Sequence, residues 1–89
     1  MNAPFDLGTV RLDQLELGTR ARVLSIDWDG LDSAEACRLR HFGFDEGVAV
    51  EPLHLGPFGR DPIAIRVDDM RVALRRREAR AVTVKFGGA

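Results

Sequence analysis

The sequence predicts a mainly β protein: a small antiparallel β-barrel of about five strands, with one short α-helix between the first and second strands. Three observations lead to this prediction: segments in which apolar and polar residues alternate, two segments in which that alternation changes phase, and one segment with helix-capping residues. The chain has 89 residues, 45% of them hydrophobic, which is ordinary for one globular domain. We therefore expect a single domain over residues 1–89, with its core at about 12–86.

Three segments in the second half of the chain alternate with a period of two, which is typical of half-buried antiparallel strands. Their apolar members stand at positions 63, 65 and 67, at 72 and 74, and at 82, 84 and 86. The residues Asp68-Asp69-Met70 separate the first two segments and leave room only for a tight hairpin. We therefore expect three strands here, of which the first two form a hairpin.

Two earlier strands, over residues 20–27 and 48–55, are less regular. The alternation changes phase between Val23 and Leu24 in the first and around Pro52 in the second. A β-bulge or a strong bend explains such a change. A strand that curls around a small barrel contributes to one wall and then to another, so the phase changes favour a barrel over a flat sheet.

The predicted helix covers residues 33–42. Asp32 or Ser33 is placed to cap its N-terminus, and Glu35 can close a capping box onto Asp32. Gly43 is placed to end the helix. Before the first predicted strand, residues 12–15 are expected to form a single turn that closes one end of the barrel.

The sequence supports neither a membrane-spanning helix nor a secretory signal. The longest uninterrupted apolar runs have three residues, whereas a membrane-spanning helix needs about 20. The N-terminal ten residues have neither a basic residue nor an apolar core segment, so no secretory signal is expected. Cys37 is the single cysteine and cannot form an internal disulfide. We expect a cytoplasmic protein that does not insert into the membrane.

Catalytic motifs are missing from the sequence. The chain contains no phosphate-binding G-x-x-x-x-G-K-[ST] motif, and its single lysine, Lys85, precedes Phe86 near the C-terminus. It also lacks H-E-x-x-H and G-x-S-x-G, and neither of its two serines stands in a nucleophile-elbow context. We therefore expect no enzymatic activity and no required cofactor.

One pair of residues is spaced for metal binding. Cys37 and His41 stand four residues apart on the predicted helix and project to the same side, so together they can bind Fe²⁺ or Zn²⁺ weakly. A structural zinc site needs four ligands, and His54 is the only other nitrogen or sulfur donor. The alternative is that Cys37 is a small buried hydrophobic residue and His41 is a solvated residue at the helix end.

The C-terminal third of the chain is basic. Residues 1–59 hold five basic and ten acidic residues (−5), and residues 60–89 hold eight basic and four acidic residues (+4). Clustered arginines can bind phosphates, but stacking aromatic residues are missing and Glu78 interrupts the cluster. We therefore favour a solvated strand face followed by a polar turn, and expect no nucleic-acid partner. The arginines concerned are Arg71, Arg75, Arg76, Arg77 and Arg80.

The segment from Gly56 to Pro62 is the strongest candidate for partner recognition. Phe58 stands between glycines in an expected loop, which gives it little chance of reaching the core. An exposed aromatic residue in such a loop suits protein recognition. The alternative is that Phe58 folds back over the open end of the barrel.

A set of motifs along the chain resembles the FeoA family, ferrous iron transport protein A. The motifs are Arg38-Leu39, Phe42-Gly43-Phe44, Gly47, Pro57, Gly59, Asp61-Pro62, Val72-Ala73-Leu74-Arg75 and Glu78-Ala79. The resemblance runs from about Leu12 to Val84. It implies a cytoplasmic SH3-like domain that modulates FeoB, the membrane transporter with a cytoplasmic GTPase domain, by protein contact. Two positions depart from the family pattern: Glu46 replaces a common proline and Asp69 a common glycine, and both lie in expected turns.

The resemblance implies a partner but no agreed set of functional residues. Our prediction for the partner-binding surface is the Pro57-Phe58-Arg60 loop together with the helix face around Arg38. An exposed edge strand would equally support a homodimer, so the oligomeric state stays open.

Overall fold

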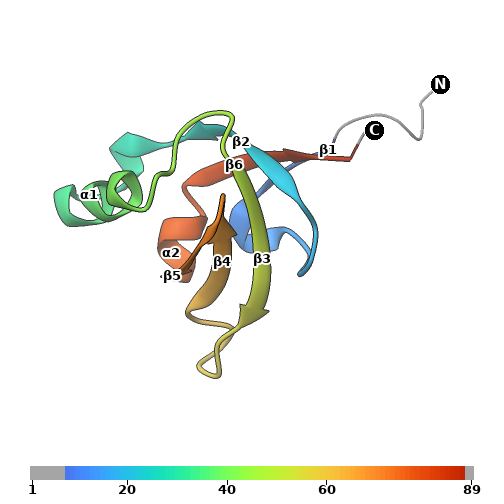
Figure 1. Cartoon of the computed structure of the whole chain (residues 1–89). Coiled ribbons are helices and arrows are strands. Elements are labelled where there is room, and N and C mark those ends of the chain that lie inside the picture. Colours follow the sequence, from blue (N-terminus) through green and yellow to red (C-terminus); the bar gives the residue numbers. More distant parts are fainter. Residues whose placement is uncertain (1–7, 88–89) are drawn as a thin grey trace.

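A computed structural model describes residues 8–87, which form one antiparallel sheet of six strands, two short α-helices and two 3-10 turns (Figure 1). The strands are β1 (Gly8–Arg11), β2 (Ala21–Ile26), β3 (Ala49–Leu55), β4 (Ile63–Val67), β5 (Met70–Leu74) and β6 (Val82–Phe86). The helices are α1 (Ser33–His41) and α2 (Arg76–Ala79), and the 3-10 turns are η1 (Leu12–Gln14) and η2 (Trp28–Gly30). Residues 1–7, on which the expectation of no secretory signal mostly depends, lie outside the described residues. None of the helices in 8–87 has the length and apolar content needed to cross a membrane.

The strands are ordered β1-β6-β2-β3-β4-β5, and every neighbouring pair is antiparallel. The mainly β, antiparallel class is therefore confirmed. Within residues 8–87 the strand order is open, with β1 and β5 at the edges of the sheet. The expectation of about five strands closed into a barrel is therefore corrected to six strands in an open sheet. In Figure 1, β3 and β4 run across the direction of β1 and β6, which shows how strongly the sheet is bent.

The additional strand is β1, whose sequence GTVR contains one apolar side chain. Such a segment has too little alternation to be recognised as a strand. It forms because β6 offers backbone partners, with Gly8 opposite Phe86 and Arg11 opposite Thr83. Since β1 comes first, the strand predicted as the first is β2, and α1 lies between the second and third strands.

Both irregular strands contain the predicted bulges. The register between β2 and β6 shifts between Val23 and Ser25, and the register between β3 and β4 shifts between Pro52 and His54. These are the positions at which the alternation changes phase. Because a bulge bends a strand and increases its twist, the two bulges help the sheet to curve around its core.

The hairpin between β4 and β5 is also confirmed. Asp68 and Asp69 form a two-residue turn that places Val67 opposite Met70, so Met70 belongs to β5 and not, as predicted, to the turn. The backbone of Asp68 has a φ of +52°, a left-handed conformation that Asp tolerates better than most residues other than glycine. The turn therefore forms without a glycine.

The hydrophobic core contains most of the residues that the alternation predicted to point inward. Ile63, Ile65 and Val67 of β4 are almost completely buried. Turn η1 contributes Leu12, and Leu15 directly after it is also buried, as expected for a turn that closes one end of the core. The remaining buried hydrophobic residues are Ala21, Val23, Leu31, Leu39, Phe44, Val50, Leu74, Ala79, Val82 and Val84.

Helix α1 has the predicted ends. The carboxylate of Asp32 accepts a hydrogen bond from the Glu35 N–H at 2.8 Å, and the Glu35 carboxylate accepts one from the Asp32 N–H at 3.0 Å. At the other end Gly43 has a φ of +89°, and the N–H of Phe44 reaches back to the Leu39 carbonyl at 3.0 Å. This combination is the Schellman arrangement, for which glycine is preferred.

Candidate functional site

The loop between β3 and β4 carries the most exposed large hydrophobic residue of the described chain. Phe58 is 81% exposed, so it does not fold back over the core. The loop projects from the end of the β3–β4 hairpin, at the bottom of Figure 1. The N–H of Asp61 donates to the Phe58 carbonyl at 3.2 Å, and Gly59 and Arg60 have positive φ values of +64° and +70°. This tight turn presents the Phe58 ring to solvent.

The base of the loop is held firmly to the body of the protein. The N–H of Gly56 donates to the Pro62 carbonyl at 2.7 Å. A Cβ at position 56 would lie 2.6 Å from the Asp61 carbonyl oxygen, so the backbones approach too closely for any other residue. The Asp61 carboxylate in turn accepts a hydrogen bond from the Arg76 N–H at 2.9 Å, at the start of α2. The exposed aromatic ring therefore stands on a fixed base.

Arg60 is exposed beside Phe58 and lines a shallow hollow of about 510 Å³. The hollow is also lined by residues around η1, including Glu16 and Leu17, which is 47% exposed, and by Leu55 of β3. A positive charge beside apolar surface is a common composition for a protein-binding patch. The structure thus brings Pro57, Phe58 and Arg60 together on one projecting loop.

Arg38, the fourth residue predicted to contact a partner, has a different setting. Its guanidinium donates to both carboxylate oxygens of Glu78, at 3.0 and 3.3 Å, and to the Ala73 carbonyl at 3.1 Å. It also lies 5.1 Å from the centre of the Phe42 ring. Figure 1 shows α1 well away from the β3–β4 loop. Arg38 is therefore engaged in joining α1 to β5 and α2, apart from the loop surface.

Glu78 is the ion-pair partner of Arg38, a contact that sequence reasoning missed. Its side chain is 1% exposed, and it also accepts a hydrogen bond from the Arg75 N–H at 2.9 Å. The hydrogen bonds that Arg38 donates to Glu78 raise the pKa of Arg38 above its ordinary value. Burial acts in the opposite direction, and the negative charge of Glu78 adds a smaller increase. The only hint of this contact in the sequence is that Glu78 is a single acidic residue inside an arginine-rich segment. That segment forms the short helix α2, where a polar turn was expected.

The predicted metal-binding pair lies on the surface of α1. Cys37 and His41 are both exposed, so the alternative that Cys37 is buried is wrong. Among residues 8–87, no group of three or more His, Cys, Asp and Glu side chains is arranged to bind a metal ion. Cys37 and His41 therefore offer at most two ligands from one copy of the chain.

Two members of the arginine cluster have acidic partners. Arg77 lies 2.9 Å from Glu35 on α1, and Arg80 lies 3.8 Å from Asp13 in η1. These ion pairs leave less positive charge than the sequence suggests. Arg77 and Arg80 therefore help to attach the α2 segment to α1 and η1.

Comparison with known proteins places the chain in a family. The model of the FeoA domain matches residues 10–86. The FeoA protein from Chlorobium tepidum is 31% identical, with a TM-score of 0.75, over 86% of this chain and 70% of that one. A FeoA from Stenotrophomonas maltophilia, solved with zinc and described as a prokaryotic SH3 domain protein, is 40% identical, with a TM-score of 0.69, over 82% of this chain and 86% of that one. The iron(II) transport protein A from Clostridium thermocellum is 26% identical, with a TM-score of 0.75, over 86% of this chain and 45% of that one.

More distant similarity concerns the fold alone. The T. acidophilum IdeR structure is 19% identical, with a TM-score of 0.74, and this chain spans 34% of its length. A comparison with curated proteins finds no match. The family model nevertheless covers most of the chain, and two FeoA structures exceed 30% identity. This chain therefore belongs to the FeoA family, whose members are associated with ferrous iron transport.

Proposed function

We propose that this chain is a noncatalytic cytoplasmic accessory protein of ferrous iron uptake that binds the GTPase region of a FeoB-type transporter and modulates it by protein contact. Family membership supports the link to ferrous iron transport. The S. maltophilia relative is described as a candidate activating factor for ferrous iron transport, which is a regulatory role rather than a catalytic one. We assign the contact to the loop that carries Pro57, Phe58 and Arg60.

The observation that carries this proposal is the exposure of Phe58 on a loop with a fixed base. Burying a phenylalanine side chain contributes about 1.5–3 kcal/mol, so leaving it 81% exposed forgoes most of that gain in the free protein. Burial against a partner would recover it, and aromatic anchors dominate many interfaces. The hydrogen bonds at Gly56 and Asp61 already order the loop, which lowers the entropy cost of binding.

The test is capture of the cytoplasmic GTPase region of the FeoB transporter from the same cell, with the full chain immobilised. We expect Phe58→Ala to weaken binding about tenfold or more, because about 1.4 kcal/mol corresponds to a factor of ten. Arg60→Ala should weaken it less. Leu24→Ala is the matched control, because Leu24 is another exposed hydrophobic residue, at 41%, on β2.

Each binding measurement is repeated with Fe²⁺ present and with Fe²⁺ chelated, and the GTP hydrolysis rate is followed in parallel. If Phe58→Ala leaves binding unchanged, or if Leu24→Ala weakens it equally, the loop is rejected as the contact surface. Absence of capture by the unaltered chain under both metal conditions would reject the partner. Arg38 is not a clean probe of contact, because its removal also leaves Glu78 without its ion-pair partner.

A second candidate function is metal-dependent regulation through Cys37 and His41. Both side chains are exposed one turn apart on α1, and the S. maltophilia relative was solved with zinc. Because one copy offers two ligands, binding would need a carboxylate or ligands from a second molecule. Calorimetric titration with Zn²⁺ and Fe²⁺, compared between the unaltered chain and the variant Cys37→Ala/His41→Ala, tests it. Negligible affinity in the unaltered chain would end this candidate.

A further inference from the structure

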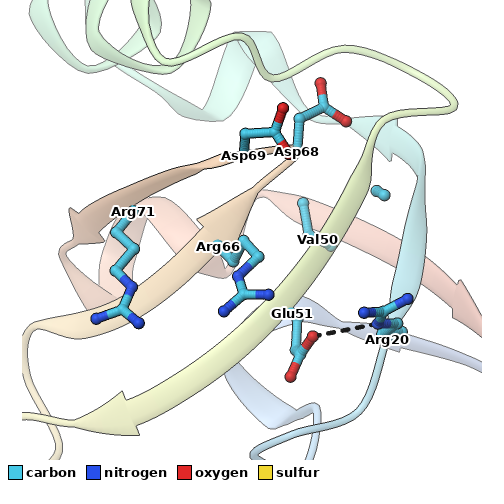
Figure 2. Close-up of a pocket in the computed structure, with 8 residues that line it drawn as sticks. Arg20, Val50, Glu51, Arg66, Asp68, Asp69 and Arg71 are labelled. Carbon is cyan, nitrogen blue, oxygen red and sulfur yellow. Dashed lines mark ion pairs between the residues drawn. The ribbon is translucent and has the colours of Figure 1, made fainter.

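A row of charged side chains crosses the outer face of the sheet at β3, β4 and β5 (Figure 2). In the strand register, Glu51 of β3 stands opposite Arg66 of β4, and Arg66 stands opposite Arg71 of β5. Arg20, just before β2, completes the row beside Glu51. These residues line a hollow of about 580 Å³ together with the turn between β4 and β5.

The positive charges in this row are not balanced evenly. Arg20 pairs with Glu51 at 3.4 Å, which is the only ion pair within the hollow among residues 8–87. Neither Arg66 nor Arg71 has a carboxylate of the described chain within 4.0 Å. The carboxylates of Asp68 and Asp69 point away from the two guanidinium groups in Figure 2. Two neighbouring guanidinium groups are therefore left without an anion.

The backbone register forces Arg66 and Arg71 close together. The two-residue turn closes on Val67 and Met70, so the next pair, Arg66 and Arg71, is the non-hydrogen-bonded kind with the shorter Cα separation. Like charges directly opposite each other on one face destabilise a sheet. An oxyanion bound between the two guanidinium groups would remove this repulsion and accept hydrogen bonds from both.

The adjacent edge of the sheet is open to strand pairing. Within residues 8–87, β5 pairs with β4 alone. Hydrogen-bonded and non-hydrogen-bonded pairs alternate along β4 and β5, and Arg71 and Ala73 both belong to non-hydrogen-bonded pairs. Their N–H and C=O groups therefore point away from β4. The hydrogen bond from Arg38 to the Ala73 carbonyl agrees with this direction and occupies that one group. The backbone of Arg71 thus lies at an open edge, beside the two guanidinium groups.

We propose that the β5 edge and the Arg66–Arg71 pair form a second docking surface, which binds an extended acidic segment of a partner protein as an added strand. Backbone hydrogen bonds along β5 would provide part of the affinity, and a carboxylate against the two guanidinium groups would provide the specificity. A second copy of β5 is a poor occupant, because it would bring another Arg71 to the edge that already carries Arg71 and Arg66. The proposal does not depend on the transporter contact at Phe58.

The experiment is an NMR titration of the ¹⁵N-labelled full chain with a synthetic peptide of alternating Glu and Val residues. A peptide with Gln in place of Glu and a separate titration with inorganic phosphate are run in parallel. We expect the amide signals of Arg71 and Ala73 to shift with the Glu peptide. Arg66→Gln/Arg71→Gln should weaken binding about tenfold or more, because hydrogen bonds to charged groups are stronger than neutral ones.

The matched control is Arg40→Gln/Arg77→Gln, which changes the net charge equally but alters arginines on α1 and α2. The proposal is overturned if the Gln peptide binds as well as the Glu peptide, or if the control weakens binding equally. Phosphate that displaces the peptide while shifting the same amides would indicate a small-anion site instead. Concentration-dependent self-association with protection of the β5 amides would indicate a second copy as the occupant.

Stability measurements complete the test. Because Arg66 and Arg71 repel each other in the free chain, Arg66→Gln/Arg71→Gln should leave the free energy of unfolding unchanged or slightly higher. A clear loss of stability in this variant would overturn the premise that Arg66 and Arg71 repel each other in the free chain.

Discussion

The ion pair between Arg38 and Glu78 yields the most quantitative prediction. The perturbation is Arg38→Met, which keeps an unbranched apolar side chain and removes the guanidinium. The variant leaves the Glu78 carboxylate, 1% exposed, with a single described hydrogen bond, from the Arg75 N–H at 2.9 Å. Breaking a buried ion pair from one side typically costs about 3–5 kcal/mol.

Partial solvation reduces this cost. The Arg38 side chain is 46% exposed, so water can reach the Glu78 carboxylate once the guanidinium is gone. We therefore expect Arg38→Met to lower the free energy of unfolding by about 2–3 kcal/mol. For a domain of this size, such a loss corresponds to a fall in Tm of about 10–20 °C.

Removing the charge of Glu78 instead of that of Arg38 should lower the free energy of unfolding by less. Glu78→Gln keeps an oxygen that can accept from the Arg75 N–H, and it leaves a half-exposed arginine rather than a buried carboxylate. We expect this variant to lose about 1 kcal/mol. The double variant Arg38→Met/Glu78→Gln should then be at least about 1 kcal/mol more stable than Arg38→Met alone, because no buried charge remains without a partner.

Urea unfolding of the four proteins at neutral pH measures these differences. Trp28 is the single tryptophan, and the guanidinium of Arg40 lies 4.3 Å from its ring centre, so its fluorescence should report unfolding. Circular dichroism provides a second probe of the same transition. A loss below about 0.5 kcal/mol for Arg38→Met, with no recovery in the double variant, would show that the pair behaves as an ordinary surface ion pair and would refute the reasoning.

Three other outcomes follow from the structure. Asp61→Ala removes the acceptor of the Arg76 N–H at the start of α2 and should cost about 1 kcal/mol in urea unfolding; an unchanged midpoint would contradict this role. Gly43→Ala should cost about 1–2 kcal/mol through its φ of +89° alone, since a Cβ there meets nothing within 4 Å, and Gly43→Asn should cost less. The raised pKa of Arg38 means that its contribution is complete below the unfolded-state pKa and is lost only as pH rises through the higher folded-state pKa. The difference between the unaltered chain and Arg38→Met should therefore stay constant from pH about 7 to about 9, and a steady decline over that range would contradict it.

Local sequence patterns predicted much of this fold. Period-two alternation identified the strands that became β4, β5 and β6, because a strand with one buried face must alternate. The changes of phase at Val23 and Pro52 marked the two bulges. The capping box at Asp32 and the glycine at position 43 fixed the ends of α1, because both depend on residues close together in the chain.

The candidate surface was predicted only in part. The glycine-flanked Phe58 indicated an exposed aromatic residue, and its 81% exposure confirms that point, whereas contact with a partner stays a prediction. Arg38 was assigned to the same surface; in the structure it donates hydrogen bonds to Glu78 and Ala73, and its contact with a partner also stays a prediction. No local sequence pattern predicts a contact between side chains that are 40 residues apart in the sequence.

By itself, the sequence determined the fold class, the helix and its caps, the bulged strands and the family to which the chain is similar. These follow from interactions among near neighbours and from the requirement that apolar side chains face one core. Tertiary structure alone decided that GTVR pairs with β6 as β1, that an arginine-rich segment forms α2, and that Arg66 and Arg71 meet across two strands. The pairing of β1 with β6 joins segments from opposite ends of the described chain, and α2 is held by contacts with Arg38 and Glu35 of α1. The Arg66–Arg71 pair depends on the strand register that the turn at Asp68 and Asp69 sets.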